Sequence, residues 1–522
     1  MKKKPVIRAA VVAPVIAALL LIGCKDKEGL SEEAVSVEED TPQAMNASSA
    51  NEDDIDTETN ITETTPQGLE SYDDSEDGGH AITVDGETAE YSNADVTKTG
   101  DSEGDEADFY GENAAIFATN GAALKLSNMN IKTDGTHANA VFSYGEGTVV
   151  DVTNSTIETS GNCSGGIMTT GGGTMNAANL TIHTSGNSSA AIRSDRGGGT
   201  VTVDGGNYIT DGVGSPAIYS TADITVNNAA LTSTASQGIV VEGKNSVTLN
   251  NVVLNADNNK HNSDKSDYYE AVMIYQSMSG DADTGLSKFS ATGGNIANVN
   301  GDIFFVNNTA TDISLSGVDI TNNGGGAFLR AAAAGWGNEG SNGGKVNLAA
   351  KAQKIDGDII VDEISSLNLY LTEGSTFTGA VNPEGASGEV YVELTGESKW
   401  VLTGDSYITS LTCTAGSIDL NGYTLTVNGN AYLEGSSSEG SAVEIETGNE
   451  NERREGMQAP PDGGKQPPQD GDQQPPRGDK EPPQNGEIRE PEENGGSMPG
   501  NGQPPEKPNG EPPERPDGKG AF

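Results

Sequence analysis

The side chains best suited to contact a ligand recur at about one repeat length and follow small-aliphatic pairs such as Ala191-Ile192. In a strand, successive side chains point to opposite faces, so an inward isoleucine places the next residue outside. Aromatic rings can stack on sugar faces, and carboxylate and guanidinium groups hydrogen-bond strongly to polar partners. The pattern therefore predicts a polysaccharide-binding stripe on one outer face. Its predicted contact residues are Phe142, Tyr144, Arg193, Asp195, Tyr219, Glu242 and Tyr275.

A covered stripe is the alternative to an open one. Trp336 in the glycine-rich loop "AAAAGWGNEGSNGG" could be an exposed glycan contact or a plug over the seam between the early and late coils, and the long excursion over residues 256–286 could fold back onto this face. In that case the aromatic residues would be structural. The two alternatives differ in whether a sugar could reach the rings.

Catalysis is the competing functional hypothesis. The sequence "IRSDRGGG" places Arg193, Asp195 and Arg196 together, which would suit the cationic base and the carboxylate of a polysaccharide lyase. A glycoside hydrolase needs two facing carboxylates, yet Asp195 and Glu242 fall two windings apart, roughly 10 Å along a stack. An arginine–aspartate pair that closes a winding is the more common arrangement. We therefore assign no catalytic residue and expect a non-catalytic protein that binds a polysaccharide or acts as an adhesin. A structural surface spacer that binds nothing is the third hypothesis.

Acidic clusters could hold Ca²⁺, which prefers hard oxygen ligands on flexible loops. The alternative is a solvated acidic loop, and neither cluster matches the EF-hand spacing. No other cofactor is expected, because the four histidines show no metal-ligand spacing. The candidate calcium ligands are Asp101, Glu103, Asp105 and Asp108, with a second cluster at Asp257, Asp264, Asp267, Asp281 and Asp283.

These side chains must be positioned by a repeat. "TIETSGNCSGGIMTTGGGT" (156–174) is followed by the similar "TIHTSGNSSAAIRSDRGGGT" (181–200), and Thr148, Thr174 and Thr200 are 26 residues apart. A fixed period of this length, in short β-branched runs broken by glycine, indicates a solenoid and not helices. We predict an all-β fold: a single parallel β-helix of about 13 coils at ~4.8 Å each. A hairpin sandwich is disfavoured, because few Asn-Gly turns occur.

Each predicted coil has a tight corner and an inward aliphatic residue. Asn and Gly tolerate the positive φ of such corners, and stacked Asn side chains can form ladders. The predicted corner residues are Asn128, Asn154, Asn179, Gly205, Asn228, Asn251, Gly293 and Gly317. The predicted inward residues are Ile116, Val141, Ile167, Ile192, Ile218, Ile239, Val272 and Ile303, with Val306 assigned to the outer stripe.

The ends of the chain differ from the repeats. Basic residues precede an apolar run at 11–22 that is too short to span a bilayer, so residues 1–24 fit a signal peptide, and this segment ends in Leu21-Ile22-Gly23-Cys24. This motif resembles the lipobox of bacterial lipoproteins, which implies lipidation at Cys24 and a membrane anchor. Residues 25–80 hold 18 acidic residues against two lysines, which is typical of a disordered tether. The segment 448–522 holds 16 of the 22 prolines and reads as an extended, disordered tail.

The net charge of −49 argues against nucleic acid as a partner, because its phosphates would be repelled. We expect a monomer on the extracellular face of the cell membrane. Its ligand would be a polysaccharide or a component of a host or neighbouring cell surface.

The late repeats have a different pattern. Gly374-Ser375-x-Phe377-x-Gly379, followed by Trp400, Asp405-Ser406 and Leu411, resembles the late passenger coils of pertactin-like autotransporter adhesins. Residues 82–350 look like bacterial adhesin-type β-helix surface proteins. This resemblance implies a right-handed coil and an adhesive role. We place the β-helix at 81–354 and the late passenger-like coils with their cap at 355–447. No translocating barrel follows, so the lipobox replaces self-export.

Overall fold

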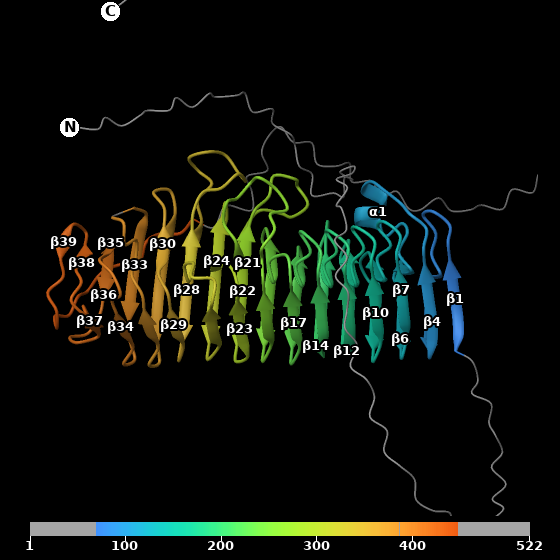
Figure 1. The fold of residues 1–522 in the computed structure, drawn as a ribbon, viewed down its shortest axis with the longest axis horizontal. Helices are drawn as coiled ribbons and strands as arrows, with labels where there is room; N and C mark the ends of the chain where they lie inside the picture. Colours follow the sequence, from blue (N-terminus) through green and yellow to red (C-terminus); the bar gives the residue numbers. More distant parts are fainter. Residues whose placement is uncertain (1–68, 386, 447–522) are drawn as a thin grey trace, which may run out of the picture. The chain divides into compact units, whose positions relative to one another are not determined.

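The computed structural model describes residues 69–385 and 387–446, which form one continuous stack of coils (Figure 1). Neighbouring coils pair in parallel and in register; for example, Ile167 lies between Val141 and Ile192. Most coils contribute one strand to an 11-stranded sheet and two strands to a 21-stranded sheet. The fold is therefore the predicted parallel β-helix.

The 11-stranded sheet carries the predicted stripe. Its members are β2 (Ile82–Asp85), β5 (Ile116–Thr119), β8 (Val141–Tyr144), β11 (Ile167–Thr170), β13 (Ile192–Ser194), β15 (Ile218–Ser220), β18 (Ile239–Glu242), β21 (Glu270–Tyr275), β24 (Asp302–Asn307), β27 (Leu329–Ala331) and β30 (Ile359–Val361).

The 21-stranded sheet consists of two columns that merge where β12 and β14 run through both. One column is β3 (Thr88–Ser92), β6 (Ala123–Ser127), β9 (Val149–Thr153), β12 (Gly173–Thr184), β14 (Gly199–Thr210), β16 (Asp223–Asn227), β19 (Ser246–Asn250), β22 (Leu286–Thr292), β25 (Ala310–Ser316), β28 (Lys345–Lys351), β31 (Ser366–Thr372), β33 (Glu389–Leu394) and β36 (Ser410–Thr412). The other column shares β12 and β14 and adds β1 (Glu70–Asp74), β4 (Ala94–Lys98), β7 (Asn130–Thr133), β10 (Thr156–Thr159), β17 (Ala230–Ser233), β20 (Val253–Ala256), β23 (Asn295–Asn298) and β26 (Asp319–Asn322).

Two small sheets complete the late coils. They are β29 (Lys354–Asp356), β32 (Thr376–Thr378), β34 (Lys399–Val401) and β37 (Ile418–Asp419), and then β35 (Ser406–Ile408), β38 (Leu425–Val427) and β39 (Asn430–Ala431). The stack continues across residue 355, because β28 pairs with β31 and β27 pairs with β30. The change of sequence pattern is thus a change in coil cross-section within one stack.

The tight corners are confirmed. All eight predicted corner residues have φ between 49° and 72°, the left-handed region that Asn and Gly tolerate. The predicted ladders are also present: the Asn128 amide donates to Asn93 at 3.1 Å, and Asn251 donates to Asn228 at 3.1 Å.

The predicted inward residues all lie in one continuous hydrophobic core. One register assignment was wrong. Phe304, not Ile303, pairs with Val272, so Val306 belongs to the core and Asn307 takes the outer position beside Tyr275. The pattern failed because Ile303, a bulky residue, occupies the position where the preceding coil has the small Ala271.

Described structure begins at residue 69, inside the segment predicted as a tether, and β1 already belongs to the stack. The ring centroids of Tyr72 and Tyr91 lie 5.4 Å apart, which anchors this first strand. The lipobox with Cys24 and the proline-rich tail lie outside the described residues. Within the described ranges, no helix is both long and apolar enough to cross a bilayer.

Candidate functional site

The outer face of the 11-stranded sheet is covered by two sets of insertions. The first, here called the early cover, is residues 99–115 and contains α1 (Asp105–Tyr110). The second, the late cover, comprises residues 257–269, 276–285 and 332–344. The helix and the longer late loops project along the same long edge of the stack (Figure 1).

The early cover seals the first part of the stripe. Ala114 packs with Phe142 and Met168, and all three are fully buried. The hydroxyl of Thr170 donates to the backbone oxygen of Phe109 at 2.6 Å, which fixes the end of the short helix on the sheet. Phe142 therefore acts as a packing residue in this structure.

The late cover seals the other end. Trp336 meets Tyr275 edge-on with ring centroids 5.2 Å apart, and Tyr268 lies 5.3 Å from Phe305. The Arg330 guanidinium stacks 4.3 Å above the Tyr268 ring. The alternative that the 256–286 excursion covers the stripe is the arrangement observed, and Trp336 packs against Tyr275 of the stripe itself.

Beneath the covers the charged members of the stripe contact one another, although Arg193 Nη1 and Glu242 Oε1 find no hydrogen-bond partner among the described residues. Arg193 donates to Asp195 at 2.9 Å, and the Tyr275 hydroxyl donates to Glu242 at 2.9 Å. Tyr219 donates to the same Glu242 oxygen. Glu242 and Tyr275 are partners in the sheet register, whereas Arg193 and Asp195 lie two residues apart in the chain, and both carboxylates are buried.

The predicted calcium ligands do not converge on one point. Asp108 lies 3.0 Å from His137 and 4.0 Å from Arg193, and its ligand atom lies within 4.8 Å of those of His137 and Cys163, a grouping that the sequence spacing did not reveal. Asp105 lies 3.5 Å from Arg196. Asp101 and Glu103 instead line an acidic surface hollow of about 440 Å³, shared with Asp77, Gly78, Ser102, Glu112 and Thr136.

Arg196 joins the two covers, and the sequence analysis missed this role. Its guanidinium lies 2.7 Å from Asp281 of the late cover and stacks 3.8 Å from the Phe109 ring of the early cover. These partners are 85 and 87 positions away in the sequence, so no spacing rule relates them. Only the sequence "DRGGG", an arginine in a tight glycine turn, marks the position.

Burial shifts the acidity of the covered carboxyls. It raises the pKa of Asp195 to about 7, although the neighbouring Arg193 acts in the opposite direction. Burial also raises the pKa of Glu270 to about 8 against the hydrogen bond from Gln237, and it raises the pKa of Glu242. Perturbed acids can mark active sites, but these lie under packed cover.

One aromatic pair at the edge of the stripe is accessible. Tyr110 of α1 is 39% exposed, and it meets the partly exposed Tyr144 edge-on with centroids 5.8 Å apart. Arg196, whose side chain is 26% exposed, and the exposed Asp105 lie nearby. Comparisons with protein families, with curated proteins and with solved structures found no match to this chain.

Proposed function

We propose that the protein is a lipid-anchored, extracellular β-helix that binds polysaccharide without cleaving it, as an adhesin or a carbohydrate-binding surface protein. The observation that carries the proposal is the accessible Tyr110–Tyr144 pair beside Arg196 and Asp105. Rings offer a stacking surface, and the flanking charges offer hydrogen bonds to hydroxyl groups. Tyr144 is the member of the predicted stripe that combines a partly exposed ring with nearby charged side chains.

The competing hypothesis is a lyase or glycoside hydrolase on the same scaffold. It is less well supported, because Asp195 and Glu242 are both buried and each is held by its neighbours. A hydrolytic acid and base must flank the scissile bond directly. Release of reducing ends or of unsaturated products from any polysaccharide in a panel would overturn the non-catalytic proposal.

Removing both accessible rings should weaken polysaccharide binding about 10-fold, because about 60 Å² of apolar ring surface buried against the sugar contributes about 1.5 kcal/mol. The variant is Tyr110→Ala with Tyr144→Ala, measured by affinity electrophoresis in gels that contain each polymer. Tyr423→Ala is the matched control, since Tyr423 is 43% exposed but lies in the last coils. Equal retention of the double variant and the wild type on every bound polymer would exclude this surface.

The anchor is tested separately at Cys24. Substitution Cys24→Ala should abolish incorporation of labelled fatty acid and move the protein from the membrane fraction to the soluble fraction. A stably held protein needs more than one acyl chain, so loss of lipidation should release nearly all of it. Retention in the membrane fraction without the label would contradict the lipoprotein assignment.

A further inference from the structure

The last described residues form a strap, here defined as 436–446, that folds back over the late coils. Ser438 exchanges two backbone hydrogen bonds with Cys413, each 3.0 Å long, as in an antiparallel pair. The Gly440 amide then donates to the Thr412 hydroxyl at 3.0 Å, and the Ser441 amide donates to the Ser410 hydroxyl at 2.9 Å. The strap is thus held mainly through its backbone.

Asn368 of β31 clamps the strap further along. The Val443 amide donates to the Asn368 side-chain oxygen at 2.8 Å, and the Asn368 amide donates back to the Val443 carbonyl at 2.9 Å. Asn368 is buried and also donates to Asn347 at 3.0 Å, and Asn347 donates to Asp312 at 2.9 Å. A side-chain amide that bonds both the N–H and the C=O of one residue recognises an extended backbone, whatever the side chain attached to it.

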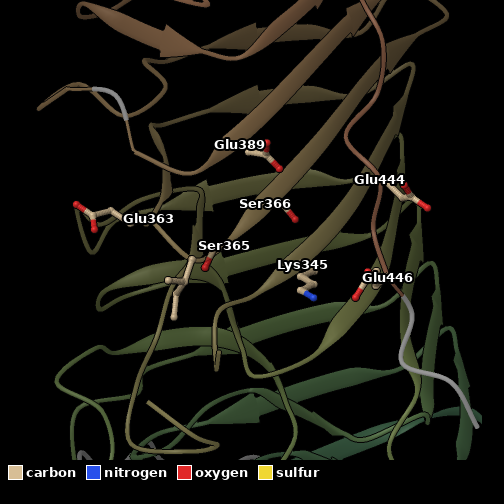
Figure 2. Close-up of a pocket in the computed structure, with 8 residues that line it drawn as sticks. Lys345, Glu363, Ser365, Ser366, Glu389, Glu444 and Glu446 are labelled. Atoms are coloured by element: carbon tan, nitrogen blue, oxygen red, sulfur yellow. The ribbon is translucent and has the colours of Figure 1, made fainter. Parts of the chain in front are cut away.

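Beyond the clamp, the strap closes a hollow of about 300 Å³ (Figure 2). The coils contribute Lys345, Ser366 and Glu389, and the strap contributes Glu444 and Glu446. The view shows the strap passing beside the strand ends, with Glu446 directed toward Lys345. Val443 and Ile445 are partly buried while Glu444 and Glu446 are exposed, which is the alternation of a strand lying on a surface.

We propose that this face, formed by Ser410, Thr412, Asn368 and Lys345, is a strand-binding site that also accepts the strap of a second copy of this chain. The strap adds side-chain fit to these backbone contacts, because Val443 and Ile445 are partly buried and Glu446 is directed toward Lys345, and an identical strap would repeat both features. None of these contacts depends on the two parts belonging to one chain. Exchange of an identical element conserves every contact and is a low-cost route to dimers.

The connection to the strap is suited to exchange. Leu433, just before it, is 76% exposed, and Gly435 has φ of 79°, a conformation that glycine adopts without strain. Opening this connection would carry the strap away from its own coils. The monomer expected from the sequence corresponds to the closed form, and the exchanged form is a dimer joined at the late coils.

Complementation between two full-length variants tests the proposal. Ser438→Pro with Val443→Pro removes two amide donors of the strap, which leaves its face vacant. Asn368→Asp keeps a strap that can dock but sets a carboxylate against the Val443 carbonyl on its own face. We expect each variant alone to be monomeric, and their mixture to form a 1:1 heterodimer by size exclusion with light scattering.

A peptide of residues 434–446 provides the second measurement. It should bind the double-proline variant at least 10-fold more tightly than wild type, whose own strap competes at an effective concentration of about millimolar. The same peptide with Val443→Pro should not bind. Thermal melting checks that both variants keep the β-helix. Absence of peptide binding by a folded double-proline variant would overturn the strand site, and peptide binding without a heterodimer would overturn the second copy as its occupant.

Discussion

Replacing Gly186 by alanine should destabilise the β-helix severely, by roughly 3 kcal/mol or more, which is the upper range of overpacking costs. A Cβ at this position would lie 1.8 Å from the backbone oxygen of Gly161 in the preceding coil. Because the obstacle is backbone and not a flexible side chain, neither coil can yield without breaking strand pairing. We expect a large fall in the melting temperature by circular dichroism and rapid cleavage by protease.

The clash repeats along the stack, which makes the effect general. A Cβ at Gly135, Gly161 or Gly212 would likewise lie between 1.8 and 2.0 Å from the carbonyl oxygen of the glycine one coil earlier. Gly404→Ala is the matched control, because its Cβ would meet only the Ala380 and Pro383 side chains, at 3.3 and 3.8 Å. Equal melting temperatures for Gly186→Ala and wild type would contradict the coil spacing on which the whole stack depends.

This glycine column could have been found in the sequence. The two similar sequences at 156–174 and 181–200 both contain Ser-Gly-Asn at the same place, at Gly161 and Gly186. Asp-Gly recurs at Gly135 and Gly212. The architecture could be predicted for the same reason. Each coil of a solenoid has the same conformational constraints, so asparagine or glycine recurs at the corner position of successive coils. A single bulky exception, Ile303 in a small-residue position, was enough to shift one register.

The covers could not be predicted in the same way. They are unique insertions, and their docking depends on contacts between distant segments, such as Arg196 with Asp281 and Trp336 with Tyr275. Strand alternation identified which residues leave the core, and it did so correctly for Arg193. It contains no information on whether a loop then buries them. Outward orientation and exposure are separate properties, and only the first repeats with the coil.

Raising the pH should destabilise the covered face, and Glu270→Gln should remove much of that effect. Glu270 is buried on β21, accepts a hydrogen bond from Gln237 at 2.7 Å, and pairs in register with Asp302, itself held by Arg330 at 2.6 Å. An ionised Glu270 would be buried away from water and would be repelled by the neighbouring Asp302 carboxylate. Accordingly its pKa is about 8 in the folded chain, against 4.5 for an ordinary glutamate.

The sign follows from which state binds the proton more tightly. The folded chain binds the Glu270 proton more tightly than the unfolded chain. The contribution of Glu270 to the free energy of unfolding is therefore fully present below pH 4.5 and is lost as the pH rises through about 8. The gap between the two values corresponds to a loss on the order of 5 kcal/mol. Denaturant midpoints at pH 5, 7 and 9 should therefore fall steeply for wild type and much less for Glu270→Gln, with a residual slope from Asp195. Glu90→Gln, on the exposed face of β3, should keep the wild-type slope; if Glu270→Gln keeps it too, the pH response arises elsewhere in the chain.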